Sequence, residues 1–405
     1  MPRLLLLLPA AGYANQDFIA AAARLNIELV ACADYCHRLA PGWGLPPLMS
    51  VPFDQPDAAL PRVLGALTQP VDAVLAVDDH GQALAARLRV ALKLPGNPPE
   101  AVATLTDKLR FRQLQQAIGL PHPAFAEIRE TDHAAAAPGF PLVVKARRLN
   151  ASRGVIRADN ADELAQALKW VRRIQSRIQR EADSLLLEHF IPGAEVALDG
   201  VLSGGSLQVL AVFDKPDPLD GPTFEETLFI TPSRQAEPVQ RALADAVQRA
   251  CFGAGLTDGV IHAEARINDA GVWLLEIAPR GIGGLCGRVL DTTLGMSSAE
   301  IVLRHAVGLP LPMRAHDHAA GVMMIPIPAA GIFLGVDGLD DARAVPGISG
   351  LEITAHPGQL VAPPPEGAAY LGFIFSRAAT PQQAEAALRA AHGKLAVNIQ
   401  PLVKP

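Results

Sequence analysis

The sequence predicts a mixed α/β and α+β protein made of three segments. Strand and helix patterns alternate through the first hundred residues, a Pro- and Gly-rich cluster at 95–99 interrupts them, and from about residue 311 short strands and turns replace the longer elements. The chain has 405 residues, 50% of them hydrophobic, which is enough for two or three domains with apolar cores. We expect a parallel α/β domain at 1–100, a domain with mixed sheets at 101–310 and a small α+β domain at 311–405.

The first segment predicts a parallel sheet with crossover helices, because its strands and helices alternate. The leucine run at 4–8 is too short for a signal peptide and ends at Pro9, so a strand buried on both faces explains it better. The other strands are expected at 27–32 and 73–77, and the helices at 17–25, 57–67 and 82–92. Asp78 and Asp79 follow the last strand, at the sheet edge where ligands bind, and either cap the next helix or touch a substrate.

The second segment predicts a domain that is α+β with mixed strands. Its helices are expected at 107–118, 162–180 and 238–251. Its strands are expected at 141–145, 154–156, 184–190, 195–202, 209–213, 227–231, 259–267 and 272–277. The last two are joined by the turn sequence Asn-Asp-Ala-Gly and therefore predict a hairpin. In the third segment one late helix, at 381–392, follows several short strands.

Charge and composition exclude several classes of protein. The formal net charge is −6 and the chain has no long Lys/Arg run, so a nucleic-acid partner is not expected. No stretch reaches about 18 apolar residues, so we expect no membrane span. The four cysteines form no Cys-x-x-Cys motif and indicate reduced thiols in a cytoplasmic protein. Cys32, Cys36 and His37 offer a metal-site alternative, which we weigh below buried or loop thiols.

Charged residues lie at facing positions of the predicted hairpin. Alternate side chains of a strand share a face, so His262, Glu264 and Arg266 point the same way. Hairpin pairing brings Glu264 opposite Glu276, where two carboxylates repel unless a cation lies between them. Carboxylate oxygens of this kind suit Mg²⁺, and solvated charges on an edge hairpin are the alternative.

Three further stretches suggest a phosphate site. Arg280 and the glycine-rich residues 281–284 follow the hairpin, and such a loop either binds an anion through its backbone or is an ordinary turn. Lys145 ends an apolar strand before a polar loop that contains Ser152, and Lys108 opens a helix. The strand at 184–190 breaks near Ile191, so its backbone is free to bind a nucleobase edge, and Glu195 could then accept from ribose hydroxyls.

In this order the motifs resemble the ATP-grasp superfamily, and in particular the carboxylate–amine ligases similar to L-amino-acid ligases. The lysine strand Pro141-Leu-Val-Val-Lys145 is followed by Ser152-Arg153-Gly154, which looks like the phosphate-covering loop. Two further stretches look like the family's metal and acyl-phosphate strands: His262-Ala-Glu264 and Glu276-Ile-Ala-Pro-Arg280. The other matching stretches are Thr106-Asp107-Lys108, Leu187-Glu188-His189-Phe190-Ile191, Gly193-Ala194-Glu195, Phe213-Asp214-Lys215 and Tyr370-Leu-Gly-Phe-Ile-Phe375.

The resemblance implies a pre-ATP-grasp domain, a bilobal ATP-grasp domain whose small lobe is about 122–190, and a small C-terminal domain. It implies an ADP-forming ligase that uses ATP and Mg²⁺, with Mn²⁺ as an alternative ion, to join a small carboxylate, such as an amino acid, to an amine through an acyl phosphate. The implied nucleotide residues are Lys108, Lys145, Ser152, Glu188, Ile191, Glu195 and Lys215; the metal ligands Glu264 and Glu276; the catalytic residues Arg280 and His262; and the substrate residues Glu226, Gly283 and Gly284. Related ligases are often dimers, so the resemblance leaves a homodimer as one option, and the sequence does not set the oligomeric state.

One departure from the family pattern leaves alternatives open. The family commonly has Glu-x-Asn-x-Arg, whose Asn is a metal ligand, but position 278 is Ala here. One Mg²⁺ should still bind, and the second depends on water or Glu226 as a substitute. A non-catalytic, ATP-binding regulatory protein and a biotin-carboxylase-like or phosphotransferase enzyme are the competing interpretations. His262 either positions a substrate or is a structural histidine hydrogen-bonded in the sheet.

Overall fold

The computed structural model describes residues 1–10, 12–34, 49–129, 138–178, 184–312, 314, 318–367 and 369–402. Cys36 and His37 lie outside these ranges, so the metal-site alternative for Cys32 is not tested. Cys32, Cys251 and Cys286 are buried free thiols. Within these ranges no helix is long and apolar enough to cross a bilayer.

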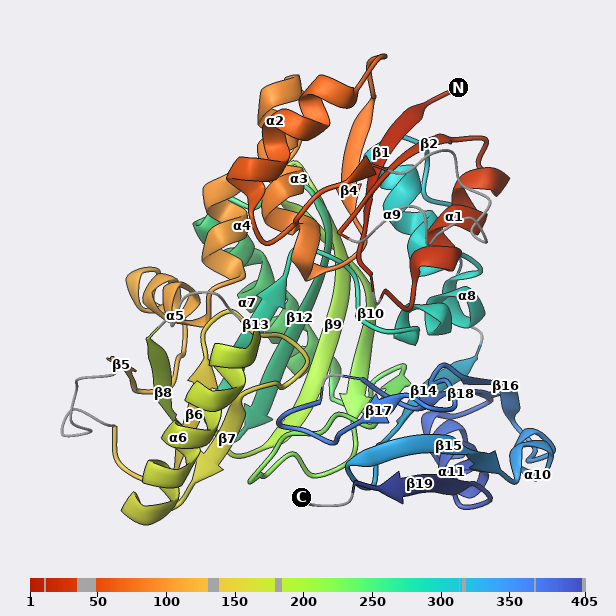
Figure 1. Cartoon of the computed structure of the whole chain (residues 1–405). Coiled ribbons are helices and arrows are strands. Elements are labelled where there is room, and N and C mark those ends of the chain that lie inside the picture. The colour runs from red at the N-terminus through yellow and green to blue at the C-terminus, as the bar shows by residue number, and fades with distance from the viewer. Residues whose placement is uncertain are drawn as a thin grey trace.

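The N-terminal segment forms the predicted parallel sheet, in the order β3-β2-β1-β4. The leucines of β1 are fully buried because this strand lies in the middle of the sheet and is covered on both faces. Figure 1 shows this sheet in red and orange at the top of the molecule, between its helices. The elements are β1 (Arg3–Leu8), α1 (Asn15–Arg24), β2 (Glu28–Ala33), β3 (Met49–Ser50), α2 (Pro56–Ala66), β4 (Ala73–Ala76), η3 (Asp79–Gly81) and α3 (Gln82–Leu92).

A four-stranded antiparallel sheet, β5-β8-β6-β7, forms a separate small lobe at the lower left of Figure 1. Helix α6 packs on β6 and β7, and its apolar residues Leu164, Val171 and Ile174 join the buried cluster of this lobe. The lobe consists of β5 (Phe125–Ile128), β6 (Leu142–Ala146), β7 (Val155–Ala158), α6 (Ala161–Ile178) and β8 (Leu185–His189).

An eight-stranded sheet runs through the middle of the molecule, in the order β13-β12-β9-β10-β11-β14-β18-β16. It crosses the boundary expected at residue 311, because β11 pairs with β14 over four residue pairs. Its strands are β9 (Ala194–Ser203), β10 (Ser206–Lys215), β11 (Leu228–Thr231), β12 (Gly259–Asn268), β13 (Gly271–Ala278), β14 (Ala319–Ile325), β16 (Ile348–Ile353) and β18 (Gly372–Ala378). The C-terminal segment therefore extends the central sheet, and the domain bounds stay a prediction.

The remaining C-terminal elements form a small second layer. The sheet β17-β15-β19 lies beside α10 and α11, in blue at the lower right of Figure 1. One buried cluster joins α11 to β11, β14 and β18 of the central sheet. The elements are β15 (Gly331–Asp337), α10 (Leu339–Arg343), β17 (Leu360–Val361), α11 (Pro381–His392) and β19 (Ala396–Pro401).

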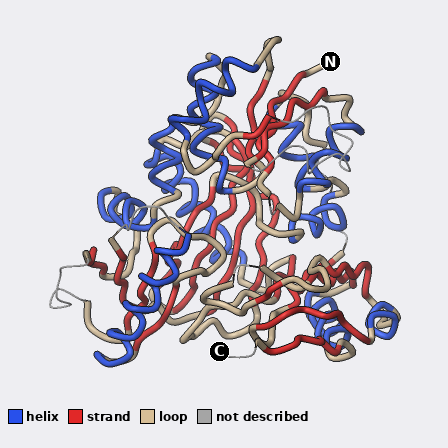
Figure 2. The backbone as a smooth tube through the Cα atoms, viewed as in Figure 1, coloured by secondary structure: helices blue, strands red, loops and turns tan. Residues whose placement is uncertain are grey.

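Helices from the middle of the chain cover the central sheet and connect it to the N-terminal sheet. Helix α7 packs on β10 and β13, and α8 packs on β10 and β14, so the strands in Figure 2 run between blue helices. Helix α9 packs on α1 and β4 and ties the middle of the chain to the N-terminal sheet. These helices are α4 (Pro99–Leu105), α5 (Lys108–Ala117), α7 (Glu237–Ala254), η5 (Cys286–Arg288), α8 (Val289–Leu294) and α9 (Ser298–Ala306).

The expected elements are present, most of them with shifted ends, and the structure adds the strands β3 and β5, the helices α4, α8, α9 and α10, and the short helices η3 and η5. Helix α4 starts at Pro99, inside the cluster that the sequence analysis treated only as a boundary. Proline is favoured at the first position of a helix, because that N–H has no intrahelical partner anyway. The breaker cluster therefore separates two helices and supplies the first residue of the second one.

Candidate active site

The edges of the sheets and the loops between them surround one cavity of about 850 Å³. It is lined from the N-terminal segment, the small lobe, the central sheet and the C-terminal segment. The predicted site residues that line it are Lys108, Lys145, Ser152, Glu188, Ile191, Glu195, Glu226, His262, Glu264, Glu276, Arg280, Gly283 and Gly284. Lys215 instead lines a smaller neighbouring cavity, which it shares with Glu195.

The metal hairpin has the predicted register. Strands β12 and β13 pair antiparallel, with Glu264 opposite Glu276, so the two side chains start from the same face of the sheet. A β-bulge follows Glu264 and shifts the pairing by one residue. The two carboxylates have different partners, because Glu276 Oε2 lies 3.4 Å from Lys108 Nζ while Glu264 belongs to a partly buried acidic cluster.

The acidic cluster consists of Glu195, Glu226 and Glu264, whose nearest carboxylate oxygens all lie within 4.8 Å of one another. Lys215 Nζ contacts all three, at 2.5 Å from Glu195, in close contact with Glu226 and 3.5 Å from Glu264. Burial and the charge of Glu264 raise the pKa of Glu226 to about 8, despite Lys215. The raised pKa of Glu226 shows that Lys215 does not fully offset the repulsion among the three carboxylates, and a divalent cation would reduce that repulsion.

His262 is held between two carboxylates. Its Nδ1 lies 2.7 Å from Asp199 Oδ1 and its Nε2 lies 3.3 Å from Glu264 Oε1. Burial alone would lower the pKa of His262, but hydrogen bonds to Asp199 and Glu264 raise it to about 9. The imidazole is therefore protonated at neutral pH and donates to both acids. The fully buried Asp199 also accepts from the N–H of Ile282, at 3.3 Å, and so connects His262 to the glycine-rich loop.

Lys145 and Arg112 enclose Glu188 on β8. Glu188 Oε2 lies 2.6 Å from Lys145 Nζ and its Oε1 lies 2.6 Å from Arg112 Nε. Burial raises the pKa of Glu188, but the two cations lower it to about 2, so the carboxyl is ionised. The arginine also donates to the carbonyl oxygens of Leu274 and Leu275 on β13, at 3.3 and 2.8 Å, so this triad ties the small lobe to the metal hairpin.

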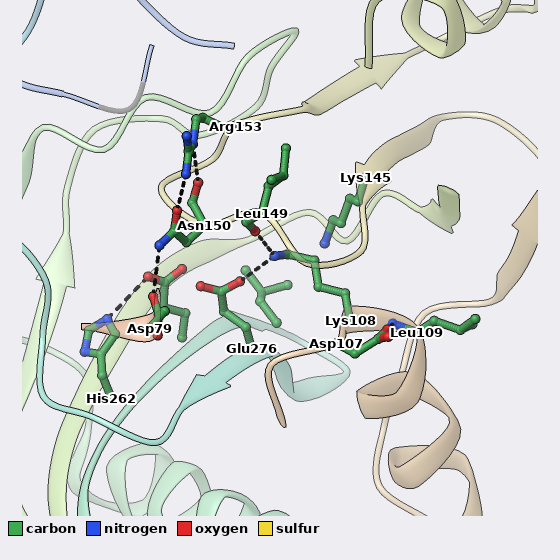
Figure 3. A network of polar contacts seen from close by, with 12 residues as sticks. Asp79, Asp107, Lys108, Leu109, Lys145, Leu149, Asn150, Arg153, His262 and Glu276 are labelled. Atoms are coloured by element: carbon green, nitrogen blue, oxygen red, sulfur yellow. Dashed lines mark hydrogen bonds and ion pairs between the residues drawn. The ribbon is translucent and has the colours of Figure 1, made fainter. Parts of the chain in front are cut away.

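Lys108 lies where the small lobe meets the metal hairpin. It is the first residue of α5, and Asp107 caps the helix by accepting from the N–H groups of Leu109 and Arg110. Lys108 Nζ donates to the carbonyl oxygen of Leu149, at 2.7 Å, and approaches Glu276. Figure 3 shows the lysine between the polar loop and the hairpin, with Lys145 nearby. Both amines are therefore placed to meet an anion in the cavity.

Arg280 forms a bidentate pair with Asp79, one of the two acids at the end of β4. Its Nε and Nη2 lie 2.8 and 2.6 Å from the carboxylate oxygens, and its Nη1 donates to the carbonyl oxygen of Gly281, at 2.8 Å. Asp79 also accepts from Asn150 Nδ2, at 3.2 Å, and Arg153 donates to Asn150, as Figure 3 shows. The arginine thus keeps unused N–H groups while Asp79 fixes its plane.

Asp78 caps the next helix, which is one of the two roles that the sequence analysis gave for Asp78 and Asp79. Its carboxylate accepts from the N–H of His80, at 3.0 Å, and caps the short helix η3. Burial and the neighbouring Asp79 raise the pKa of Asp78 to about 6.

Aromatic and guanidinium groups form the end of the cavity beside the strand break. Phe190 and Phe224 stack with ring centroids 6.5 Å apart, and the guanidinium of Arg266 lies 4.8 Å from the Phe190 ring. Arg266 also donates to Glu195 and to the carbonyl oxygen of Ile191. A flat apolar wall beside polar backbone groups suits a nucleobase. Glu195 is engaged by Lys215 and Arg266, so a ribose contact remains a prediction.

The residues present fit a divalent cation and a triphosphate. Three clustered carboxylates and a facing fourth, Glu276, supply the oxygen ligands that Mg²⁺ prefers, and the amines of Lys108 and Lys145 face the same cavity. The sequence analysis did not assign Asp199 or Arg112 to the site. Asp199 has a signal in the sequence, because it is a charged residue in the otherwise apolar run 196–202.

Family models match two parts of the chain. Residues 138–289 match an ATP-grasp domain, and residues 323–400 match the L-amino acid ligase C-terminal domain 2. The fold is similar to that of the L-amino acid ligase from Bacillus licheniformis, with a TM-score of 0.82 and 24% identity over 99% of both chains. The N5-carboxyaminoimidazole ribonucleotide synthetase from Thermotoga maritima matches with a TM-score of 0.76 and 17% identity, over 99% of this chain and all of that one.

Curated relatives include ligases and synthases. Chicken carnosine synthase 1 is 32% identical over 278 residues, which is 63% of this chain and 30% of that protein. The D-alanine–D-alanine ligase of Syntrophotalea carbinolica is 29% identical over 213 residues, 51% of this chain and 66% of that protein. Across these two, the match spans between about a third and two thirds of the relative's length. The chain therefore contains an ATP-grasp domain at 138–289 and an L-amino acid ligase C-terminal domain at 323–400.

Proposed function

We propose that this protein is an ADP-forming ligase that joins a small carboxylate, such as an amino acid, to an amine through an acyl phosphate. The observation that carries the proposal is the content of one cavity, which combines two lysines, the Glu264–Glu276 hairpin and Arg280. The family assignment supports the same activity. The catalytic, metal and substrate roles below are part of the proposal.

The lysines bind and orient the nucleotide. Lys108 and Lys145 contact the phosphates, and the wall around Phe190 and Ile191 receives the base. Ser152 and Arg153, at the end of the polar loop, contribute the lid over the phosphates. A bound Mg²⁺ supplies neutralisation of the charge that develops on the transferring phosphoryl group.

The hairpin residues would hold the ion. Glu264 on β12 and Glu276 on β13 would be its ligands, and Glu226 in the acidic cluster would take the place of the amide ligand that is missing at position 278. His262 holds Glu264 in place through its hydrogen bond. Metal binding would also displace the proton that the raised pKa of Glu226 favours.

Arg280 and the glycine-rich loop act on the carboxylate. The carboxylate oxygen of the substrate attacks the γ-phosphorus and ADP leaves; the amine nitrogen then attacks the acyl carbon, phosphate leaves, and the nitrogen loses a proton. The unused N–H groups of Arg280, with those of Gly283 and Gly284, face the oxygens that gain charge in both steps. Exclusion of water by the small lobe prevents hydrolysis of the acyl phosphate.

Substrate-dependent release of ADP and phosphate across a panel of amino-acid pairs tests this function. Glu276→Gln should lower kcat by at least about 100-fold and weaken Mn²⁺ binding followed by electron paramagnetic resonance, because one charged oxygen ligand is lost. Asp340→Asn, at an exposed pair with Arg343, is the control and should change neither.

Other outcomes favour the competing functions. Turnover that survives Glu276→Gln would show that the metal role is wrong. Nucleotide binding without phosphate release on any pair would favour a regulatory ATP-binding protein. Turnover that depends on bicarbonate would favour a carboxylation enzyme.

A further inference from the structure

We propose that Glu366, in the C-terminal segment, is a positioning residue that holds the small lobe over the nucleotide. The inference concerns the short turn at residues 363–367, which we call the C-terminal turn. It rests on the proposed function only in that the nucleotide binds in the main cavity. The family models place this turn in the C-terminal domain, outside the matched ATP-grasp domain.

The C-terminal turn contacts the small lobe at two neighbouring points. Glu366 Oε1 accepts from Trp170 Nε1 of helix α6, at 2.5 Å, and lies 3.4 Å from Arg173 Nη2 one turn further along. The carbonyl oxygen of Pro365 accepts from the N–H of Gly154, at 3.3 Å. Positions 196 residues apart in the sequence are therefore joined directly.

The turn itself is tightly built. The N–H of Gly367 donates to the carbonyl oxygen of Pro363, at 3.1 Å, which closes the turn. A Cβ at Gly367 would lie 1.8 Å from the carbonyl oxygen of Ala362, so only glycine fits there. Because the backbone of such a turn is rigid, the side chain of Glu366 loses less conformational freedom when it contacts the small lobe.

The two contacts reach the part of the small lobe that faces the nucleotide. Gly154 ends the polar loop that carries Ser152 and Arg153 into the cavity, and it has a left-handed backbone with φ of 62°. Its carbonyl oxygen accepts from the N–H of Ala146, at 2.9 Å, directly after Lys145. Helix α6 packs on β6, the strand that carries this lysine. A shift of Trp170 and Gly154 therefore moves the lysine and the loop together.

The junction can also open. Among the described residues the buried apolar cluster of the small lobe contains none from the C-terminal segment, so the named contacts here are polar. The side chain of Glu366 is 32% exposed and that of Arg173 is 56% exposed. Polar contacts at a partly exposed junction are weak enough to break during nucleotide exchange and strong enough to bias closure.

Nucleotide binding tests the inference without turnover. The affinity of a non-hydrolysable ATP analogue with Mg²⁺ is measured by titration calorimetry for the full chain and for Glu366→Ala, Trp170→Phe and the double variant. Each single variant should weaken binding by about threefold to tenfold, and the double variant by no more than the worse single one, because both single changes remove the same Trp170–Glu366 hydrogen bond. Glu366→Gln keeps an acceptor for the indole and should lie between wild type and Glu366→Ala, and Asp340→Asn should bind like wild type.

Turnover adds a readout that a merely structural role would not move. In the wild type the ratio of phosphate released to amide formed should be near one, and in Glu366→Ala it should rise, because a loosely held lobe admits water to the acyl phosphate. Unchanged affinity in Glu366→Ala, or losses that multiply in the double variant, would overturn the proposal. Tight nucleotide binding that depends on Glu366, with no ligation on any substrate pair, would refute the ligase and leave Glu366 its role; no nucleotide binding by the wild type would refute both.

Discussion

Single ionised side chains in the site are held by opposite charges that come from other elements. Glu188 is the clearest case, because it is 2% exposed and lies between Lys145 and Arg112. Removing one member of such a group leaves an uncompensated buried charge, which costs about 3–5 kcal/mol. The triad therefore fixes the position of Lys145 for phosphate binding, and its ionisation state affects stability.

We expect Glu188 to make the protein acid-sensitive. Its pKa falls from an ordinary 4.5 to about 2 on folding, so between these values the unfolded chain binds more protons. The stabilisation, about 3 kcal/mol, is complete above pH 4.5 and is lost as the pH falls towards 2. Thermal unfolding from pH 7 to 3 should show the difference in Tm between wild type and Glu188→Gln shrinking below pH 4.5.

The matched control for this experiment is Glu237→Gln. Glu237 pairs with Arg241 in the first turns of α7, and its side chain is 83% exposed. The Tm of Glu237→Gln should stay close to that of the wild type at every pH, because exposed ion pairs contribute about 0–1 kcal/mol to stability. If the Tm difference between wild type and Glu188→Gln stayed constant with pH, the two cations would not lower the pKa of Glu188 as proposed.

The sequence predicted site residues that belong to local motifs, and it missed their distant partners. Glu264 and Glu276 were predicted to face each other because hairpin pairing depends only on neighbouring residues, and the register confirms it. The partner of Arg280 was missed because Asp79 lies 201 residues away and only tertiary packing brings the two together. For Lys215 the resemblance implied a nucleotide contact, but the structure places this residue in the lining of the smaller neighbouring cavity.

Among the elements, long periodic ones were predicted well and short ones poorly. Helix α11 has the predicted bounds, because a threonine cap and a proline mark its start and its apolar residues follow helical spacing. Helix α9 was missed although Ser297 and Glu300 form a capping-box sequence, with Ser297 Oγ accepting from the N–H of Glu300. Strand β5 was missed because four residues carry little periodicity and pair only at a sheet edge.

The break between β8 and β9 depends on Gly193, and we expect substitution of this glycine to destabilise the protein. Gly193 has φ of 127°, and a Cβ there would lie 2.3 Å from the carbonyl oxygen of Ile267 on β12. Gly193→Ala should therefore combine backbone strain with a steric clash and lower stability by about 2–4 kcal/mol. Chemical denaturation and the affinity for a non-hydrolysable ATP analogue should both report the change.

Gly271 provides a matched control for the backbone strain. Its φ is 122°, close to that of Gly193, but a Cβ there would meet no atom within 4 Å. Gly271→Ala should cost only the strain of its backbone, about 1–2 kcal/mol, and leave nucleotide affinity unchanged. Equal losses in the two variants would mean that close packing against β12 does not shape the strand break.

At the scale of the whole molecule, the three segments share cores rather than touching at surfaces. Ala299 and Leu303 of α9 complete the apolar cluster around β1 and β2, and β14 joins the C-terminal segment to the central sheet. The sequence pattern marked where local structure changes, but it could not show that a sheet continues across such a change. Pairing between β11 and β14 depends on long-range contacts that no local pattern encodes.

Phe373 on β18 is the side chain in which these shared cores meet. Its ring is fully buried, lies 5.2 Å from the ring of Tyr13 in the N-terminal segment, and belongs to the cluster that contains Phe213 and Leu285. A Cβ at Gly284 would lie 2.9 Å from the ring, so the phenyl group packs directly against the glycine-rich loop. One residue of the C-terminal segment thus supports both the N-terminal segment and the loop that we propose binds the acyl phosphate.

Phe373→Ala should therefore weaken the molecule and its site together. Loss of a fully buried ring costs about 3–5 kcal/mol, and the cavity that it leaves adjoins Gly284. We expect a lower Tm and, at temperatures where the variant is still folded, a raised KM for the carboxylate with little change in the affinity for the ATP analogue, whose phosphate-binding lysines lie on other elements. Phe252→Ala, at a side chain 73% exposed, should change neither quantity. A stable Phe373→Ala variant, or one that loses nucleotide and carboxylate binding equally, would show that the loop does not depend on this contact.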